Sequence, residues 1–118
     1  MPPNDRFTSL RKNISVSLLR AQQMIQRGDY AGAEALYKEA LKQWRSASAP
    51  KAEEDQFIIS LGKCYEAQRK YEDAYALYME ALNHLTGASY DNVYTSFLYL
   101  NERMGTFTTK APKDLLDT

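Results

Sequence analysis

The chain has 118 residues, a length that suits one domain able to bury a hydrophobic core. Fifteen basic and fifteen acidic residues cancel, which argues against a nucleic-acid partner, because such a partner needs a basic stripe. The single cysteine, Cys64, excludes a disulfide within the chain and is expected to be a small buried residue. No run of 18 apolar residues and no signal-peptide core occur, so we expect no membrane partner and a cytoplasmic location.

The spacing of apolar residues predicts an all-α fold. Helix-favouring residues are frequent, Gly and Pro are few, and no alternating β pattern is present. Apolar residues that recur every three or four positions predict five helices, at about 6–27, 30–45, 51–68, 71–85 and 91–104. These helices form one domain over residues 6–105, with tails at 1–5 and 106–118.

Turn and cap signals separate the predicted helices. They are Asn4 or Asp5 before the first helix, Gly28 after it, Pro50 at the start of the third, Gly87 as the end of the fourth, and Ser89 or Asp91 before the fifth.

A nine-residue segment occurs twice. Residues 33–41 return 41 positions later as residues 74–82, with seven of nine identical. Each copy places two alanines and a tyrosine at i, i+4 and i+7, on one face of a helix: Ala33, Tyr37 and Ala40, then Ala74, Tyr78 and Ala81. The small residues predict that a neighbouring helix approaches closely at this face.

The residues around the second copy resemble a known repeat. Leu61-Gly62-x-x-Tyr65, followed by Tyr71 and then by the second copy, resembles the tetratricopeptide repeat (TPR) pattern W-x2-L-G-x2-Y, A-x3-F. The copy departs at the family's Trp, where Ile58 stands, and at its closing Pro, where Thr86 stands.

The first copy matches this pattern less well, and the interval is long. Ala21, Met24 and Arg20 replace the family's Gly, Tyr and Leu, and the copies recur at 41 residues where the family has 34. The resemblance implies a TPR-like α-α superhelix of antiparallel helix hairpins. Its repeats cover about 6–46 and 51–85, and the helix at 91–104 is the first half of a third repeat.

The resemblance also implies a function. In this family the first helices of successive repeats line a concave groove that binds a partner peptide or helix. The matching positions are Leu18, Gln22, Ile25 and Gln26, then Ile59, Lys63, Glu66 and Ala67, then Thr95, Tyr99 and Arg103. We therefore expect a non-catalytic adaptor or scaffold with a protein or peptide partner. A structural subunit of a larger assembly and a small chaperone that holds a client segment remain alternatives.

Little in the sequence indicates catalysis, a metal or a cofactor. The only histidine, His84, is explained by a favourable interaction with a helix C-terminus. No second His or Cys pair stands at zinc-ligand spacing, and no phosphate-binding glycine motif occurs. The acidic run Glu53-Glu54-Asp55 is expected to be a solvated first helical turn.

Two aromatic features give further expectations. Trp44 is expected to cover the end of a helix pair, with an exposed partner anchor as the alternative. In the last helix Tyr90, Tyr94 and Leu98 form a second apolar stripe, which predicts an exposed patch and possible self-association.

Overall fold

The computed structural model describes residues 6–104, and these residues contain helices and no strand. The all-α class is therefore confirmed, and each of the five predicted helices is present. The elements are α1 (Thr8–Gln26), α2 (Tyr30–Ser46), the 3-10 turn η1 (Lys51–Glu53), α3 (Asp55–Ala67), α4 (Tyr71–Leu82) and α5 (Gly87–Met104). The predicted tails and the candidate caps Asn4 and Asp5 lie outside the described residues.

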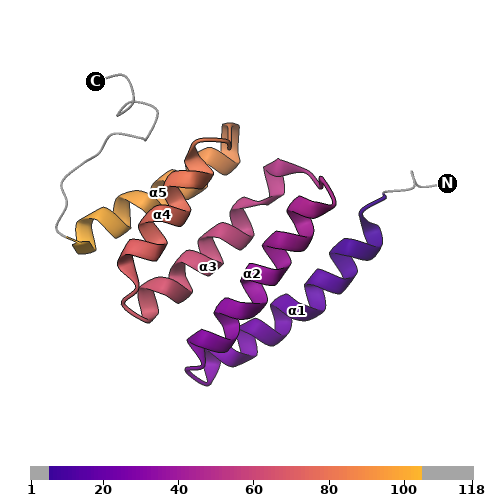
Figure 1. Ribbon diagram of the computed structural model, residues 1–118, viewed down its shortest axis with the longest axis horizontal. Helices are drawn as coiled ribbons and strands as arrows, with labels where there is room; N and C mark the ends of the chain where they lie inside the picture. The colour runs from indigo at the N-terminus through magenta and orange to yellow at the C-terminus, as the bar shows by residue number, and fades with distance from the viewer. Residues whose placement is uncertain (1–5, 105–118) are drawn as a thin grey trace.

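The helices follow one another in a row, with α1 at one end and α5 at the other (Figure 1). Each α-helix packs on the next one in the chain, and α3 also packs on α5. Short turns join α1 to α2 and α3 to α4, so each of these pairs is antiparallel. The body measures 49 × 36 × 19 Å and is therefore a flat slab.

The turn between α1 and α2 explains where these helices end and begin. Gly28 adopts the left-handed conformation with φ +79°, and its N–H donates to the Ile25 carbonyl at 2.9 Å. Asp29 then caps α2, because its carboxylate accepts a hydrogen bond from the Gly32 N–H at 2.9 Å.

The turn between α3 and α4 has the same backbone form with other residues. Arg69 has φ +62°, and its N–H donates to the Glu66 carbonyl at 2.9 Å. The N–H of Lys70 donates to the Tyr65 carbonyl at 2.8 Å, as the N–H of Asp29 does to the Met24 carbonyl at 2.8 Å. An arginine thus occupies the backbone position that holds glycine in the first turn.

The small-residue stripe of each copy lies in the core, as predicted. All six residues are at most 3% exposed: Ala33, Tyr37, Ala40, Ala74, Tyr78 and Ala81. The largest buried side chains are aromatic and come from α2, α3, α4 and α5, namely Trp44, Phe57, Tyr78 and Phe97. The repeated segment therefore supplies the close helix contacts, and aromatic side chains mostly outside it fill the rest of the core.

The junction between the two helix pairs is closed by Trp44. Its ring is 1% exposed, lies 5.5 Å from the Phe57 ring and donates a hydrogen bond to the Pro50 carbonyl at 2.8 Å. The prediction that Trp44 covers the end of a helix pair is confirmed, and the exposed-anchor alternative is wrong.

The acidic run beside this junction differs from the prediction. Glu54 is only 2% exposed, and its carboxylate binds Arg45 at 3.0 Å and the His84 ring at 3.2 Å. The expectation of a fully solvated first turn was therefore wrong. The segment that contains Glu54 begins as η1, and α3 itself starts at Asp55.

The boundary between the last two helices was also mispredicted. The fourth helix ends at Leu82, and Gly87 belongs to the first turn of α5. Ser89 lies in the first turn of α5 and does not precede it, and its hydroxyl donates to the carbonyl of Thr86, just before the helix, at 3.0 Å. Leu85, in the connection between α4 and α5, is 1% exposed and so adds to the core.

Candidate functional site

Five of the predicted groove residues meet in one pocket between α3 and α5. Lys63, Glu66 and Ala67 come from α3, and Tyr99 and Arg103 come from α5. The pocket has a volume of about 260 Å³, and its lining is completed by Tyr78 and Ser96. We call this the α3–α5 pocket.

Glu66 forms the inner wall of the α3–α5 pocket. Its carboxylate accepts a hydrogen bond from the Tyr78 hydroxyl at 3.0 Å and pairs with Arg103 Nη1 at 2.7 Å. Its side chain is only 8% exposed. Both oxygens of Glu66 are thus committed to the protein, so Glu66 positions Arg103 and presents little surface of its own.

Tyr78 reaches Glu66 because residue 62 has no side chain. A Cβ atom built on Gly62 would collide with the Tyr78 hydroxyl and ring, so the close approach requires glycine here. Burial, the Glu66 charge and the hydrogen bond to Glu66 raise the pKa of the Tyr78 phenol. The phenol therefore stays protonated and donates to the carboxylate.

The outer rim of the α3–α5 pocket is open to solvent. Tyr99 is 61% exposed, and the Arg103 side chain is 63% exposed. Lys63 is exposed, and within residues 6–104 no ion pair or hydrogen bond engages its ammonium group. The pocket thus offers one aromatic ring and two cations above a fixed inner wall.

The predicted residues of α1 do not reach this pocket. Leu18 contributes to a separate pocket of about 200 Å³, lined also by Arg11, Ile14, Ser15, Trp44, Glu53, Gln56 and Phe57. There the Arg11 guanidinium binds the Glu53 carboxylate at 2.7 Å and lies 5.6 Å from the Trp44 ring centroid. The side chains of α1 therefore contact η1, which precedes α3, and do not line the α3–α5 pocket.

The remaining predicted residues line neither of these pockets. Gln22 and Gln26 are exposed on α1, and Thr95 is exposed on α5. Ile25 and Ile59 are partly buried and pack against the core, so they contribute mainly to stability.

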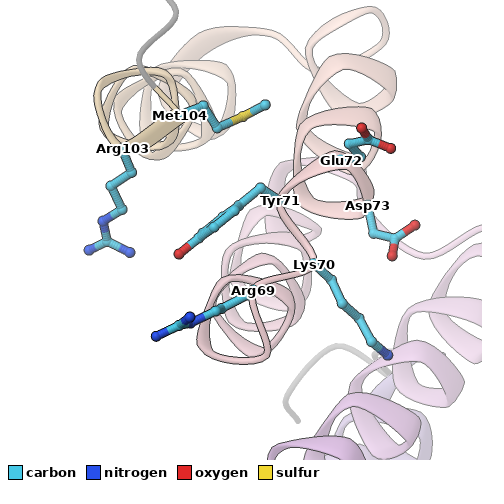
Figure 2. Close-up of a pocket in the computed structure, with 7 residues that line it drawn as sticks. All are labelled: Arg69, Lys70, Tyr71, Glu72, Asp73, Arg103 and Met104. Atoms are coloured by element: carbon cyan, nitrogen blue, oxygen red, sulfur yellow. The ribbon is translucent and has the colours of Figure 1, made fainter.

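A larger pocket, missed by the sequence reasoning, opens at the α3–α4 turn and the end of α5 (Figure 2). Its volume is about 580 Å³, and it shares Arg103 with the α3–α5 pocket. The lining residues are Arg69, Lys70, Tyr71, Glu72, Asp73, Arg103 and Met104. We call this the Arg69 pocket. The pattern of inner helix faces does not indicate this pocket, because the α3–α4 turn supplies Arg69 and Lys70 to its lining.

A polar cluster lies beside the junction that Trp44 closes. Arg45 pairs with Glu54 at 3.0 Å and with Glu80 at 2.8 Å, and His84 contacts both carboxylates at 3.2 Å. His84 Nδ1 also lies 3.1 Å from the Glu80 carbonyl. These contacts join α2, α4 and the residue before α3, so we assign the cluster to the joining of the two helix pairs.

The expected burial of Cys64 is confirmed. The side chain is 1% exposed, and burial together with the Glu34 charge raises the pKa of its thiol to about 11. Such a thiol is protonated near neutral pH and is a poor nucleophile.

Residues 6–104 contain no group of three or more His, Cys, Asp and Glu side chains placed to hold a metal ion. In the same residues no helix is both long enough and apolar enough to cross a membrane.

The expected apolar patch on α5 is partly covered. Tyr90 and Tyr94 stack on each other with ring centroids 6.0 Å apart and are half-buried against the core. Leu98 is also half-buried. The stripe is therefore less exposed than the sequence predicted.

Comparisons of the chain with protein-family models, with curated proteins and with solved structures found no match. The resemblance to the TPR family therefore rests on the repeat residues alone and stays a prediction.

Proposed function

We propose that this chain is a non-catalytic, TPR-like protein-binding module of the cytoplasm, which acts as an adaptor or scaffold. A partner peptide or helix lies across the α3–α5 pocket. The observation that carries this proposal is the open rim of the pocket, where Tyr99, Lys63 and Arg103 face solvent above a wall fixed by buried contacts.

Two features support the TPR-like assignment. The small-residue stripe is buried in the same way in both copies, and the turns that follow α1 and α3 have the same backbone hydrogen bonds. Both features recur at the 41-residue interval seen in the sequence. They are what stacked helix hairpins require, because each hairpin buries its face only against its neighbour.

The geometry suits peptide binding because the pocket is largely formed before binding. Glu66 holds Arg103, and Asn92 of α5 donates a hydrogen bond to Asp55 of α3 at 2.8 Å. The two helices are thus tied at both ends, so a partner pays little to order the surface. Tyrosine and arginine, which both stand on this rim, are among the residue types enriched at binding hot spots.

The test compares two charge reversals. A partner is first isolated with the wild-type chain, and its affinity is then measured for Lys63→Glu and for Lys42→Glu. Lys63 lies on the pocket rim, and Lys42 is exposed on α2 away from it. We expect Lys63→Glu to weaken binding roughly tenfold, since rim charges set partner choice and encounter rate. We expect Lys42→Glu to bind as the wild type does.

Thermal melts of both variants accompany the titration. An exposed charge contributes little to folding, so both melts should match the wild type. Equal affinity of the Lys63 variant and the wild type, or a loss confined to the Lys42 variant, would place the binding surface elsewhere.

A structural-subunit role is the second candidate. Val16 and Leu19 are 61% and 59% exposed on α1, at the far end of the helix row from α5. Apolar side chains at the end of a repeat array favour burial against another chain. Self-association through α5 stays a prediction, which sedimentation of the purified chain would test.

A further inference from the structure

The two equivalent turns differ at the residue that adopts a left-handed backbone. Gly28 and Arg69 occupy the same place in the repeat, 41 residues apart, with φ +79° and +62°. Glycine adopts this conformation without steric cost, whereas a side chain with a Cβ atom is strained there. The second turn therefore carries a strain that the first avoids, although the surrounding hydrogen bonds are the same.

The strained arginine points into the Arg69 pocket. Figure 2 shows that the guanidinium groups of Arg69 and Arg103 and the hydroxyl end of Tyr71 extend toward the same side of the pocket. The carboxylates of Glu72 and Asp73 extend toward the other side. The cationic groups are thus gathered apart from the acidic groups of the same pocket.

These cations differ in whether a carboxylate of the protein pairs with them. Among residues 6–104 no ion pair or hydrogen bond engages the Arg69 guanidinium, and the Arg103 guanidinium is oriented by Glu66. Lys70 extends away from both, and its ammonium group binds the Glu34 carboxylate at 3.1 Å. One guanidinium is therefore available, and a second is held in place beside it.

We propose that Arg69, Tyr71 and Arg103 bind an acidic group, a carboxylate or a phosphoryl group, of a peptide that lies across the α3–α5 pocket. This inference rests on the proposed function. The two pockets adjoin at Arg103, which lines both, so a peptide that contacts Tyr99 and Lys63 lies next to the Arg69 pocket. Guanidinium groups and a phenol hydroxyl supply the planar, charge-assisted donors that such oxygens accept.

The strain at Arg69 then has a function. Backbone strain is retained where a site requires a side chain that the backbone does not favour. Here the left-handed turn fixes where the Arg69 side chain leaves the chain, and glycine would remove both the strain and the cation.

The experiment uses a library of immobilised short peptides with one fixed central residue in a randomised background. The fixed residues are Glu, phosphoserine, Ser, Gln and Lys, and the probes are the labelled full chain and its variants. We expect the wild type to bind the Glu or phosphoserine sets about ten times more strongly than the matched Gln or Ser sets, as charge-assisted hydrogen bonds predict. The preferred set identifies which acidic group is recognised.

Three variants test the residue assignment. Arg69→Gly removes the cation and the strain, Arg69→Gln removes the charge alone, and Lys42→Gln removes a charge from α2. We expect both Arg69 variants to lose the acidic preference and still bind the other peptides. Arg69→Gly should melt at the wild-type temperature or above, so its loss of preference cannot come from unfolding. The Lys42 variant should keep the preference.

The outcomes separate this inference from the function on which it rests. If the wild type binds none of the peptides, the proposed function fails. If it binds peptides without an acidic preference, or if the Arg69 variants keep that preference, only the acidic-group site is overturned.

A last variant tests whether the chain's own carboxylates take this place. Asp114 and Asp117 are changed together to Asn. Acidic peptides that bind this variant and not the wild type would assign the pocket to those residues and would overturn its assignment to a partner.

Discussion

The contacts of Glu66 give it a structural role in place of the predicted contact with a partner. Its spacing on α3 placed it among groove residues that contact a partner, yet its carboxylate accepts from Tyr78 and pairs with Arg103. The phenol in turn lies where a side chain at residue 62 would otherwise be. Gly62, Tyr78 and Glu66 thus form one chain of contacts that ends at an exposed arginine of the pocket.

This chain of contacts predicts the effect of adding one methyl group. Gly62→Ala should lower the free energy of unfolding by about 1 to 3 kcal/mol, because the buried Tyr78 ring has no room to move. Thermal or denaturant unfolding measures the change. Adding Tyr78→Phe to Gly62→Ala should not recover the loss, because ring carbons also collide and the buried Glu66 carboxylate would lose its donor.

Gly32→Ala is the matched control for Gly62→Ala. Its added Cβ would meet only the carboxylate end of the exposed Asp29 side chain, which can move. We expect a change within about 1 kcal/mol, because alanine also favours the helix. A loss at Gly32 equal to that at Gly62 would contradict the close-contact explanation.

The roles of some residues of this site could be predicted from the sequence, and those of others could not. Tyr78 and the repeated alanines could be predicted, because their period on one helix already implies burial. The burial of Glu54 could not, because it depends on Arg45 and His84, which only the folded chain brings to it. Arg69 could not be predicted for a related reason. It shares a left-handed backbone angle with Gly28 of the first turn, although the two residues have different side chains, and the sequence does not show this angle.

At the scale of elements, the pairing of helices follows from the small-residue stripe. Ala74 and Ala81 are both 0% exposed on α4, which packs between α3 and α5. The period of such residues predicts which face a helix buries. It does not predict where the helix begins and ends. The missed start of α3 follows buried Glu54, and the missed end of α4 lies shortly before buried Leu85.

Enlarging the stripe should destabilise the fold. Ala74→Leu or Ala81→Leu is expected to cost about 1 to 3 kcal/mol, because added methylene groups have no space at a close helix contact. The exposed Ala76 of the same helix provides the control, and Ala76→Leu should leave the melting temperature nearly unchanged. Equal melts for the three variants would show that the stripe does not set the helix spacing.

At the scale of the whole molecule, the two helix pairs are joined at both ends of the α2–α3 interface. The polar cluster of Arg45, Glu54, Glu80 and His84 lies at one end. At the other end the Glu34 carboxylate of α2 accepts from Gln68 at 2.9 Å and pairs with Lys70 at 3.1 Å, beside the second turn. Separation of the pairs would break both sets of contacts.

Glu34 gives this joining a pH dependence. Partial burial alone would raise its pKa, but hydrogen bonds from Lys38, Gln68 and Lys70 outweigh burial and lower the pKa from 4.5 to about 2. A carboxyl group whose pKa is depressed on folding adds stability above its unfolded pKa and loses it as the pH falls toward the folded value. The stabilisation by Glu34 should therefore be present at neutral pH and decline between about pH 5 and pH 2.

The check compares melts of the wild type and Glu34→Gln at several pH values. We expect the variant to be less stable by about 1 kcal/mol at neutral pH, a value kept small because solvent screens the charge. The difference should shrink as the pH falls toward 3. A difference that stays constant with pH would assign the loss to packing and remove the electrostatic explanation.

The position of Trp44 allows the junction to be followed by intrinsic fluorescence. The chain has a single tryptophan, and its indole is held out of water between α2, the Pro50 carbonyl and the Phe57 ring. Fluorescence excited selectively at tryptophan therefore comes from one place, the contact between the two helix pairs. Opening of that contact should move the emission to longer wavelengths without any attached dye, so the native chain carries its own optical reporter of whether its two pairs remain together.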